Sequence, residues 1–374
     1  MSPTRPWYTV RLINIHTKNL EDFIDDTEPT PPYAILSHTW GPDHEEISFQ
    51  DLQVEEVKTG PGREKFEASC AQAILDDLSY VWIDTCCIDK TNSTELTINS
   101  MFKWYKNARL CYAYLCDVDS AENIFESQST FRKSRWFRRG WTLQELIAPE
   151  VLRFYDCNWR AIGHKRDPQV VAALVQITHI PRMFLLGIVP MNEASVAQRM
   201  SWAANRVTKR TEDLAYCLLG IFDITMPMVY GEGDKAFLRL QEVIARHIND
   251  DSILAWNFSK GSTSTKLSVV ESGGALAKSP SSFAYCSHIV PSNPSSHVGG
   301  PLNTHGGSVL LRRNVHTDSS GQRFVILQCQ LDDQPTTAIG IPYIRHPKQP
   351  AIPIENNAVS ATIEEVRIPK MTWS

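Results

Sequence analysis

The sequence predicts an α/β protein in which helices flank both faces of a parallel sheet, followed by a helical segment and a smaller β-rich domain. Between Tyr8 and Asp156, short apolar runs alternate with segments of helical periodicity, which is the pattern of parallel strands joined by helical crossovers. Helical spacing then prevails up to Trp256, and short alternating runs follow among stretches rich in Ser, Gly and Pro. We therefore expect an α/β domain over residues 1–165, a helical extension packed on it over 166–256, and a β-rich accessory domain over 257–374.

Apolar runs in the first domain predict its strands: VRLINIH, YAILSHTW (Tyr33 to Trp40), YVWID, LCYAYLCDV and VLRFYD. Segments between them place apolar residues on one helical face: REKFEASCAQAILDDL and TELTINSMFKWYKNAR. The segment SRWFRRGWTLQELIAP supplies a further helix, and TCCIDK is expected to be the exit loop of the YVWID strand.

Three segments predict the helices of the extension: SVAQRMSWAANRV, TEDLAYCLLGIF and YGEGDKAFLRLQEVIARHI. In the last region, SVLLRRNV and FVILQCQL predict strands. The stretches SKGSTSTKLSVVESGG and VPSNPSSHVGGPLNTHGG predict long loops, because Ser, Gly and Pro favour turns.

The composition narrows the class of function. A hydrophobic content of 42% and a net charge of −5 describe an ordinary globular protein without a general attraction to nucleic acid or anionic membranes. The apolar runs are too short to predict a membrane span, and the first residues do not resemble a secretory signal. The nine cysteines form no Cys-x-x-Cys pair, so we expect neither a disulfide framework nor a zinc site, but reduced thiols in a cytoplasmic protein.

The candidate functional residues follow the predicted strands. Ligands of parallel α/β sheets bind beyond the carboxyl ends of the strands, and these ends carry Ser37-His38-Thr39-Trp40, Asp84 to Cys87, and Asp117. His38 is either a donor in a ligand loop or a side chain that bonds the local backbone. Asp84 is either half of a carboxylate pair with Asp89 or a turn residue.

Two other groups of residues allow more than one interpretation. Cys86 or Cys87 with His38 could form a thiol hydrolase, although a cysteine after a central strand is more often a small buried apolar residue. Five cations lie within eight residues: Arg132, Lys133, Arg135, Arg138 and Arg139. They form either a solvated helix face or an anion site that takes phosphates. The glycine pairs in GPGREK and GEGDKA lack the spacing of a phosphate-binding loop and predict turns.

Glu145 is the sharpest candidate for catalysis. In a helix, Trp141 and Glu145 are four residues apart and share a face. A carboxyl group beside an aromatic wall is partly desolvated, which raises its pKa. Such a carboxylate can stabilise an oxocarbenium-like sugar during glycosidic cleavage. The alternative is an exposed acid paired with Arg138 or Arg139, which contributes less than about 1 kcal/mol.

The motifs together resemble the fungal heterokaryon-incompatibility (HET) domain. The resemblance is carried, in order, by YAILSHTWG, YVWIDTCCID, INSMFKWYKNARLCYAYLCDV and SRWFRRGWTLQELIAP, and it continues through RMSWAANRVTKRTEDLAYCLLGIFDITMPMVYGEGDKAFLRLQEVI. It implies a role in non-self recognition that ends in arrest or death of incompatible fused fungal cells. Some relatives continue into a nucleotide-binding module, so other incompatibility or NLR-type proteins are expected partners.

A weaker resemblance is to Toll/interleukin-1-receptor (TIR) domains, which implies a TIR/flavodoxin-like sheet. SRWFRRGWTLQEL is similar to the pattern Ser-x-x-Tyr-x-x-Ser-x-Trp-Cys-x-x-Glu-Leu of the helix that carries the NAD-cleaving glutamate. On this alignment, Glu145 takes the position of the glutamate and Trp141 that of the tryptophan. Arg139-Gly140 and Thr142 depart from the pattern.

The resemblance implies that NAD is a substrate, not a resident cofactor, and that its nicotinamide–ribose bond is hydrolysed. Glu145 would engage the ribose, Trp40 or Trp141 would stack on a ring, and Arg138 or Arg139 would face the pyrophosphate. The residues from Ser37 to Trp40, with Asp84, would shape the site. A neighbouring copy often completes TIR sites, so a homo-oligomer is expected. The rival hypothesis is a death-signalling module without catalysis, in which Glu145 is structural.

Overall fold

The computed structural model describes most of the chain, and its contacts divide into two compact units, Met1–Val189 and Pro190–Ser374. The expected boundaries near residues 165 and 256 stay predictions. The described residues are 9–24, 29–54, 58–89, 95–120, 126–256, 276–292, 303–305, 308–317, 323–332, 339–342 and 362–368.

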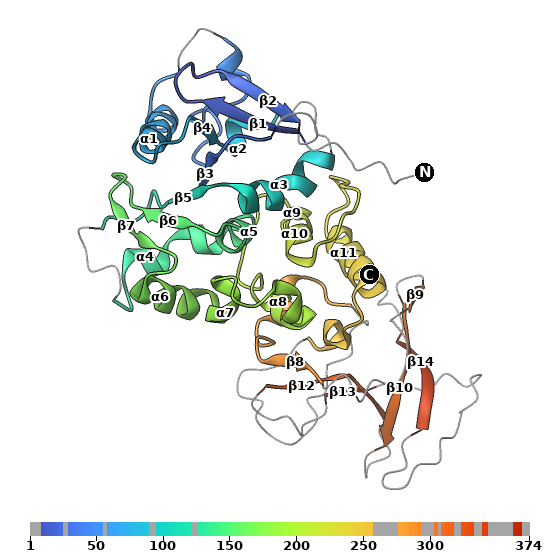
Figure 1. Ribbon diagram of the computed structural model, residues 1–374. Helices are drawn as coiled ribbons and strands as arrows, with labels where there is room; N and C mark the ends of the chain where they lie inside the picture. Colours follow the sequence, from blue (N-terminus) through green and yellow to red (C-terminus); the bar gives the residue numbers. More distant parts are fainter. Residues whose placement is uncertain are drawn as a thin grey trace. The chain divides into compact units, whose positions relative to one another are not determined.

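The first unit contains a seven-stranded sheet in the order β2-β1-β4-β3-β5-β6-β7 (Figure 1). Its strands are β1 (Thr9–Asn14), β2 (Leu20–Ile24), β3 (Tyr33–His38), β4 (Tyr80–Trp82), β5 (Leu110–Tyr114), β6 (Leu152–Tyr155) and β7 (Ala161–His164). The strands β4, β3, β5 and β6 pair in parallel. In chain order these four strands are arranged 2-1-3-4, as in flavodoxin-like sheets, which confirms the predicted α/β class. The chain reverses direction across the sheet between β3 and β5, and this pair of strands forms the switch point.

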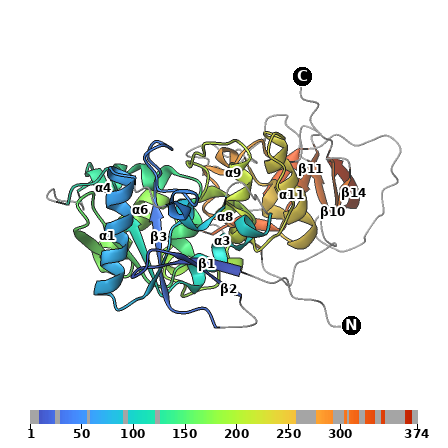
Figure 2. The same cartoon turned by 90° about the horizontal axis from the view of Figure 1, so that it is seen from above.

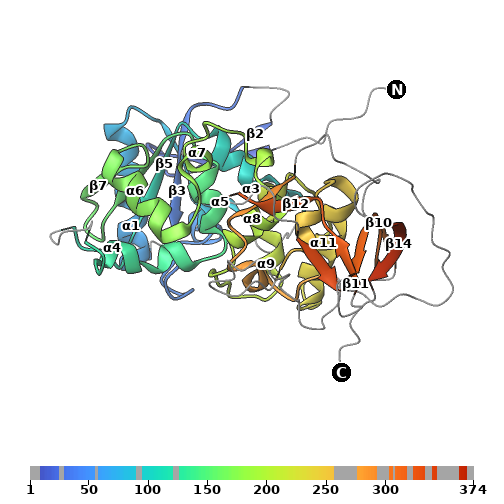
Figure 3. The ribbon, with the colours of Figure 1, turned by 90° about the horizontal axis from the view of Figure 1, so that it is seen from below.

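The helices of this unit cover both faces of the sheet. They are η1 (Asp51–Gln53), α1 (Pro61–Leu75), α2 (Asp84–Cys87), α3 (Glu95–Asn107), α4 (Thr130–Lys133), η2 (Arg135–Arg138), α5 (Thr142–Ile147), α6 (Pro168–Thr178) and α7 (Arg182–Leu185). Figure 2 shows α1 and α3 on opposite sides of β3, and Figure 3 shows α5 on the side of α3. Contacts agree with this arrangement: Tyr112 of β5 donates a hydrogen bond to Asp76 at the end of α1, whereas Trp82 of β4 packs against Tyr105 of α3.

The core strands form where the sequence is continuously apolar. All six residues of β3 are buried, as expected for a strand with helices on both faces. Successive side chains of a strand point to opposite faces, so Ser37 lies on the face of α5 and His38 on the face of α1.

The sheet is mixed, and several expectations for this unit are corrected. The strands β1 and β2 form an antiparallel hairpin whose β1 is also antiparallel to β4, and β7 is antiparallel to β6. The sequence did not indicate β2 or β7, because both are partly exposed and carry polar residues. TCCIDK is not an exit loop throughout, since Asp84–Cys87 forms α2. The segment from Ser134 is not one helix: the backbone is extended at Arg139 between η2 and α5.

The second unit combines short helices with small sheets. Its helices are η3 (Met191–Glu193), α8 (Val196–Ser201), α9 (Asp213–Tyr216), α10 (Leu219–Phe222), α11 (Lys235–His247), η4 (Asp251–Leu254) and η5 (Pro280–Phe283). Its strands are β8 (Ile289–Pro291), β9 (Asn303–His305), β10 (Ser308–Thr317), β11 (Arg323–Ile326), β12 (Cys329–Leu331), β13 (Gly340–Pro342) and β14 (Thr362–Ile368).

These strands form a two-stranded sheet, β12-β8, and a five-stranded sheet in the order β13-β11-β10-β14, in which β9 also pairs with β10. SVLLRRNV thus lies in a strand as predicted, whereas FVILQCQL is divided between β11 and β12, with Leu327 and Gln328 in neither strand. Of the two stretches predicted as long loops, SKGSTSTKLSVVESGG and most of VPSNPSSHVGGPLNTHGG lie outside the described residues.

Candidate functional site

Two polar clusters lie on opposite faces of the sheet at the carboxyl end of β3. One contains Ser37 and Glu145, and the other contains His38, Glu46, Lys65 and Asp84. Both are buried. Because β3 is one strand of the switch point, these clusters occupy the part of the sheet where open α/β folds bind ligands.

Glu145 is 3% exposed, and its carboxylate is held by Ser37. The Ser37 hydroxyl donates to Glu145 Oε2 at 2.5 Å and accepts a hydrogen bond from Trp136 Nε1 at 2.8 Å. The Thr142 hydroxyl donates to the carbonyl oxygen of Trp136 at 2.5 Å, which joins the start of α5 to η2. The two short helices therefore place an indole N–H and a carboxylate on the same serine.

The tryptophan of this cluster is Trp136, which is not among the site residues predicted from the sequence. Trp136 is fully buried and packs edge-on against Phe137 and Phe154. Trp141 lies at the residue before α5 and is half-buried. In the sequence, Trp136 is marked by its position just after a polar turn. Its contact with Ser37, however, joins residues that are 99 positions apart in the chain.

The charge of Glu145 affects its surroundings. Burial, together with the negative charges of Glu145 and Asp84, raises the pKa of Tyr105 well above its ordinary value. Tyr105 therefore stays protonated, and its hydroxyl donates to the Leu36 carbonyl oxygen at 3.0 Å. Burial and the charge of Glu145 likewise raise the pKa of Cys111. The neighbouring groups thus remain neutral beside the carboxylate.

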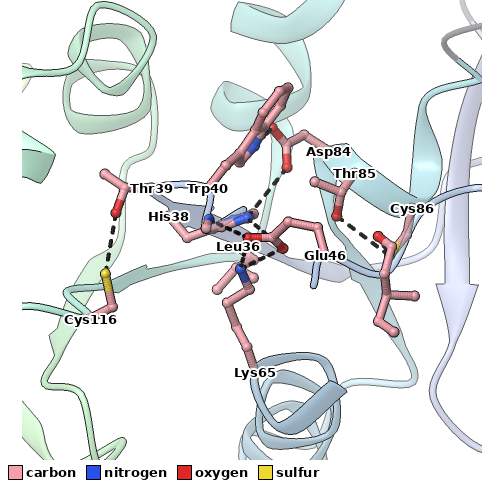
Figure 4. A network of polar contacts seen from close by, with 12 residues as sticks. Leu36, His38, Thr39, Trp40, Glu46, Lys65, Asp84, Thr85, Cys86 and Cys116 are labelled. Carbon is pink, nitrogen blue, oxygen red and sulfur yellow. Dashed lines mark hydrogen bonds and ion pairs between the residues drawn. The ribbon is translucent and has the colours of Figure 1, made fainter. Parts of the chain in front are cut away.

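On the other face, Lys65 and Glu46 form a buried ion pair (Figure 4). Lys65 Nζ lies 2.7 Å from Oε1 and 2.6 Å from Oε2 of Glu46. The Gly41 N–H also donates to Glu46 Oε1 at 2.7 Å. Burial raises the pKa of Glu46, but the charge of Lys65 and the hydrogen bonds to the carboxylate outweigh it and hold that pKa well below its usual range.

His38 lies between two carboxylates without a hydrogen bond to either. Its Nε2 is 3.8 Å from Glu46 Oε2 and 3.9 Å from Asp84 Oδ1, too far for hydrogen bonds. Among the described residues, neither His38 Nε2 nor Asp84 Oδ1 has a hydrogen-bond partner. Burial and the charge of Lys65 lower the pKa of His38, against the opposing effect of Asp84 and Glu46.

Asp84 connects this cluster to Trp40. The Trp40 indole N–H donates to Asp84 Oδ2 at 2.8 Å, and the Arg139 guanidinium lies over the Trp40 ring, 4.8 Å from its centroid. A cation stacked on an indole is held by the negative face of the ring. The four predicted residues His38, Asp84, Trp40 and Arg139 therefore lie next to one another in this order.

Thr39 belongs to a third group, at the ends of β3 and β5. Arg135 Nε donates to Thr39 Oγ1 at 3.1 Å, and Arg135 Nη2 donates to Cys116 Sγ at 2.9 Å. Arg138, predicted to face a pyrophosphate, is exposed at the end of η2. Arg135 is one of the five cations of the predicted basic cluster, and nothing in the sequence distinguishes it from the other four. Glu46 and Lys65 were not predicted, because polar loop and helix residues give no sign of burial in the sequence.

The cysteines after β4 are poor nucleophiles. Burial raises the pKa of Cys86 well above its ordinary value and that of Cys87 to about 12. The Cys86 thiol donates to the Ile47 carbonyl oxygen at 3.3 Å. Because the thiolate is the reactive form, the geometry opposes a thiol hydrolase. Within the described ranges, no group of three or more His, Cys, Asp or Glu side chains is placed to hold a metal ion.

Comparison with known protein families finds one model that matches part of the chain. Residues 33–132 match the family model described as "Heterokaryon incompatibility protein (HET)", and this segment of the chain is therefore similar to HET domains. This confirms the resemblance found in the sequence motifs. The matched residues include Ser37 and the His38 cluster and end before Trp136 and Glu145.

The chain is also similar to a particular protein, "Vegetative incompatibility protein HET-E-1" of Podospora anserina, with 46% identity over 232 residues. The match covers 60% of this chain but only 17% of that protein. No solved structure matches the chain. In the part of the chain that the structure describes, none of the helices has the length and apolarity needed to cross a membrane. The resemblance to TIR domains stays a prediction.

Proposed function

We propose that this chain is an effector of fungal heterokaryon incompatibility and that its first unit hydrolyses the nicotinamide–ribose bond of NAD. The incompatibility role is supported by the HET match and by the name of the similar Podospora protein. The chemistry is supported above all by one observation. The carboxylate of Glu145 is desolvated and held by Ser37 at the switch point of a flavodoxin-like sheet.

In the proposed reaction, the bond between the ribose and the nicotinamide nitrogen breaks, and nicotinamide leaves as a neutral base. Glu145 stabilises the oxocarbenium-like ribose by its negative charge, as carboxylates do in glycoside hydrolysis. Water adds to the ribose carbon and loses a proton, which gives ADP-ribose. Ser37 fixes one oxygen of the carboxylate, and Trp136 in turn fixes the Ser37 hydroxyl. Trp40 offers a ring for stacking, and Arg139 places positive charge beside it.

The carboxylate of Glu145 is enclosed by other side chains. At 3% exposure, the carboxylate cannot touch a ribose unless side chains above it move. Opening or completion of the site by a second copy would supply that movement. We therefore include self-association in the proposal and expect hydrolysis to rise more than linearly with protein concentration.

The second candidate is an interaction module that signals without catalysis. The same burial favours it, because a carboxylate enclosed with a serine and an indole also serves to fix α5 and η2 against β3. In this alternative, Glu145 contributes only to stability, and the toxic signal passes through protein contacts.

Nicotinamide release from NAD by the purified full chain, followed by chromatography over a range of protein concentrations, separates the two candidates. The key variant is Glu145→Gln, and Glu150→Gln is its control because Glu150 lies nearby with an 82% exposed side chain. The proposal expects release by the wild type and Glu150→Gln and none by Glu145→Gln. Absence of release at every concentration, with toxicity in fungal cells intact, would establish the interaction module instead.

A further inference from the structure

We propose that Arg135 and Thr39 form a binding site for a phosphoryl group of a nucleotide, located at the switch point between β3 and β5. The site deepens the proposed function, because a nucleotide diphosphate is part of the NAD molecule. Its existence is testable without turnover.

The guanidinium of Arg135 spans the two strands that define the switch point. Thr39 directly follows β3, and Cys116 lies just beyond β5. Each of these side chains accepts a hydrogen bond from Arg135, and the two also lie within hydrogen-bond distance of each other. Figure 4 shows Thr39 and Cys116 next to each other. A guanidinium has five N–H donors, so these two contacts leave donors for a ligand.

The Arg135 residue is exposed, and among the described residues its guanidinium forms no ion pair. Against the effect of partial burial, Cys116, Asp117 and Glu46 raise its pKa, so the guanidinium stays charged. The nearby carboxylate of Asp117 is engaged elsewhere: it accepts from the Ser134 hydroxyl at 2.7 Å and from the Arg135 backbone N–H at 2.8 Å. Asp117 therefore fixes the start of η2 and positions Arg135 without pairing with its guanidinium.

The place of the guanidinium relative to Glu145 fits a nucleotide. Ser37 holds Glu145, and Thr39 holds Arg135. Ser37 lies in β3 and Thr39 directly follows the strand, and two residues of extended chain span about 7 Å. This separation is comparable to the distance between the anomeric carbon of a ribose and its 5′ phosphate. A fork of N–H donors matches phosphate oxygens, so the arrangement selects a phosphorylated ribose.

Arg135 thereby takes the role that the resemblance to TIR domains gives to Arg138 or Arg139. Arg135 and Arg138 stand at opposite ends of η2, and only Arg135 reaches a strand end. They form a matched pair for mutation, since both changes remove one positive charge from the same short helix.

Calorimetric titration of the full chain with ADP-ribose tests the site. We expect Arg135→Gln to weaken ADP-ribose binding by roughly tenfold or more, the effect of losing a charge-assisted hydrogen bond. Arg138→Gln should change ADP-ribose binding by less than about twofold, because Arg138 does not reach the end of β3 as Arg135 does. Adenosine, which lacks phosphate, should bind the wild type and Arg135→Gln equally. Arg135→Lys, which keeps the charge, should bind more weakly than the wild type and more tightly than Arg135→Gln.

The results of the ADP-ribose titrations can be separated from those of the nicotinamide-release assay. If the wild type binds ADP-ribose through Arg135 but releases no nicotinamide from NAD, the site stands and hydrolysis fails. If NAD is hydrolysed with an unchanged KM in Arg135→Gln, hydrolysis stands and the site is wrong. Undetectable ADP-ribose binding by the wild type also overturns the proposed phosphoryl site. Should Arg135→Gln melt early, Thr39→Val and Arg135→Lys carry the same test.

Discussion

Lys65 of α1 and Glu46 of the loop after β3 form an ion pair whose side chains are 10% and 8% exposed. Both oxygens of Glu46 face Lys65 Nζ, and one also accepts the Gly41 N–H. The pair thereby fixes the loop that follows the strand of the candidate site against the first helix of the sheet.

Removal of Lys65 should strongly destabilise the first unit. Lys65→Met leaves the Glu46 carboxylate buried without its cation, and such changes cost about 3–5 kcal/mol. Thermal and urea unfolding measure the loss. Lys58→Met is the control, because the Lys58–Asp51 pair is more exposed and such pairs contribute less than about 1 kcal/mol. Equal effects of the two variants would contradict the assignment of Lys65 to a buried pair.

Stability should fall on acidification from about pH 7 to pH 5, partly because of His38. Burial lowers its pKa in the folded protein below the ordinary value of about 6.5. Below that value the unfolded chain binds a proton that the folded protein does not, so unfolding becomes easier by at most about 1.4 kcal/mol per pH unit. His38→Gln should flatten the dependence of the unfolding free energy on pH, whereas His44→Gln, at an exposed position, should leave it unchanged. A slope identical in wild type and His38→Gln would show that His38 does not contribute.

Loss of the Ser37 hydroxyl should affect both stability and the proposed chemistry. Ser37→Ala removes the acceptor of the buried Trp136 N–H and one donor to Glu145, with an expected cost of about 1–3 kcal/mol. Ser37→Thr retains a hydroxyl and is the matched variant. If nicotinamide release is found, we expect Ser37→Ala to reduce kcat more than KM, because the hydroxyl orients the carboxylate and does not touch the substrate. A change confined to KM would argue against this role.

Gly62 tests how closely α1 approaches the loop that contains Glu45. Helix propensity alone predicts that Gly62→Ala stabilises the protein by up to about 1 kcal/mol. A Cβ at this position would lie 1.9 Å from the Glu45 carbonyl oxygen, so the backbone must shift. We therefore expect destabilisation by about 1–3 kcal/mol, measured by urea unfolding. Gly41→Ala, where the nearest atom lies at 3.5 Å, should have a smaller effect.

The sequence was sufficient for the parallel core because strands buried on both faces are mostly apolar, as β3 is from Tyr33 to Leu36. It was insufficient for β2 and β7, whose partly exposed, polar residues do not stand out from loops. The start of η2 depends on Ser134 and the Arg135 backbone N–H, which bond Asp117 from another part of the fold. Periodicity within the segment contains no trace of this contact.

The candidate site was predictable only where one end of the sheet collects residues from several strands. This rule brought Ser37, His38, Thr39, Trp40 and Asp84 into consideration together, and the structure places them at that end. The partner of Ser37 is 108 residues away in the chain. The packing of η2 decides which tryptophan and which arginine approach the strand. Helical spacing favoured Trp141 instead, and the resemblance to TIR domains implied Arg138 or Arg139.

The alternation of Ser37 and His38 along β3 has a genetic consequence. Insertion or deletion of one codon within this strand would turn the serine toward Lys65 and the histidine toward Trp136, because each residue changes face. Both polar clusters would be lost in a single event, with no intermediate that retains either. Substitutions can alter the two faces independently, but length variation in β3 cannot, so viable alleles should conserve the length of this strand even where they differ in its residues.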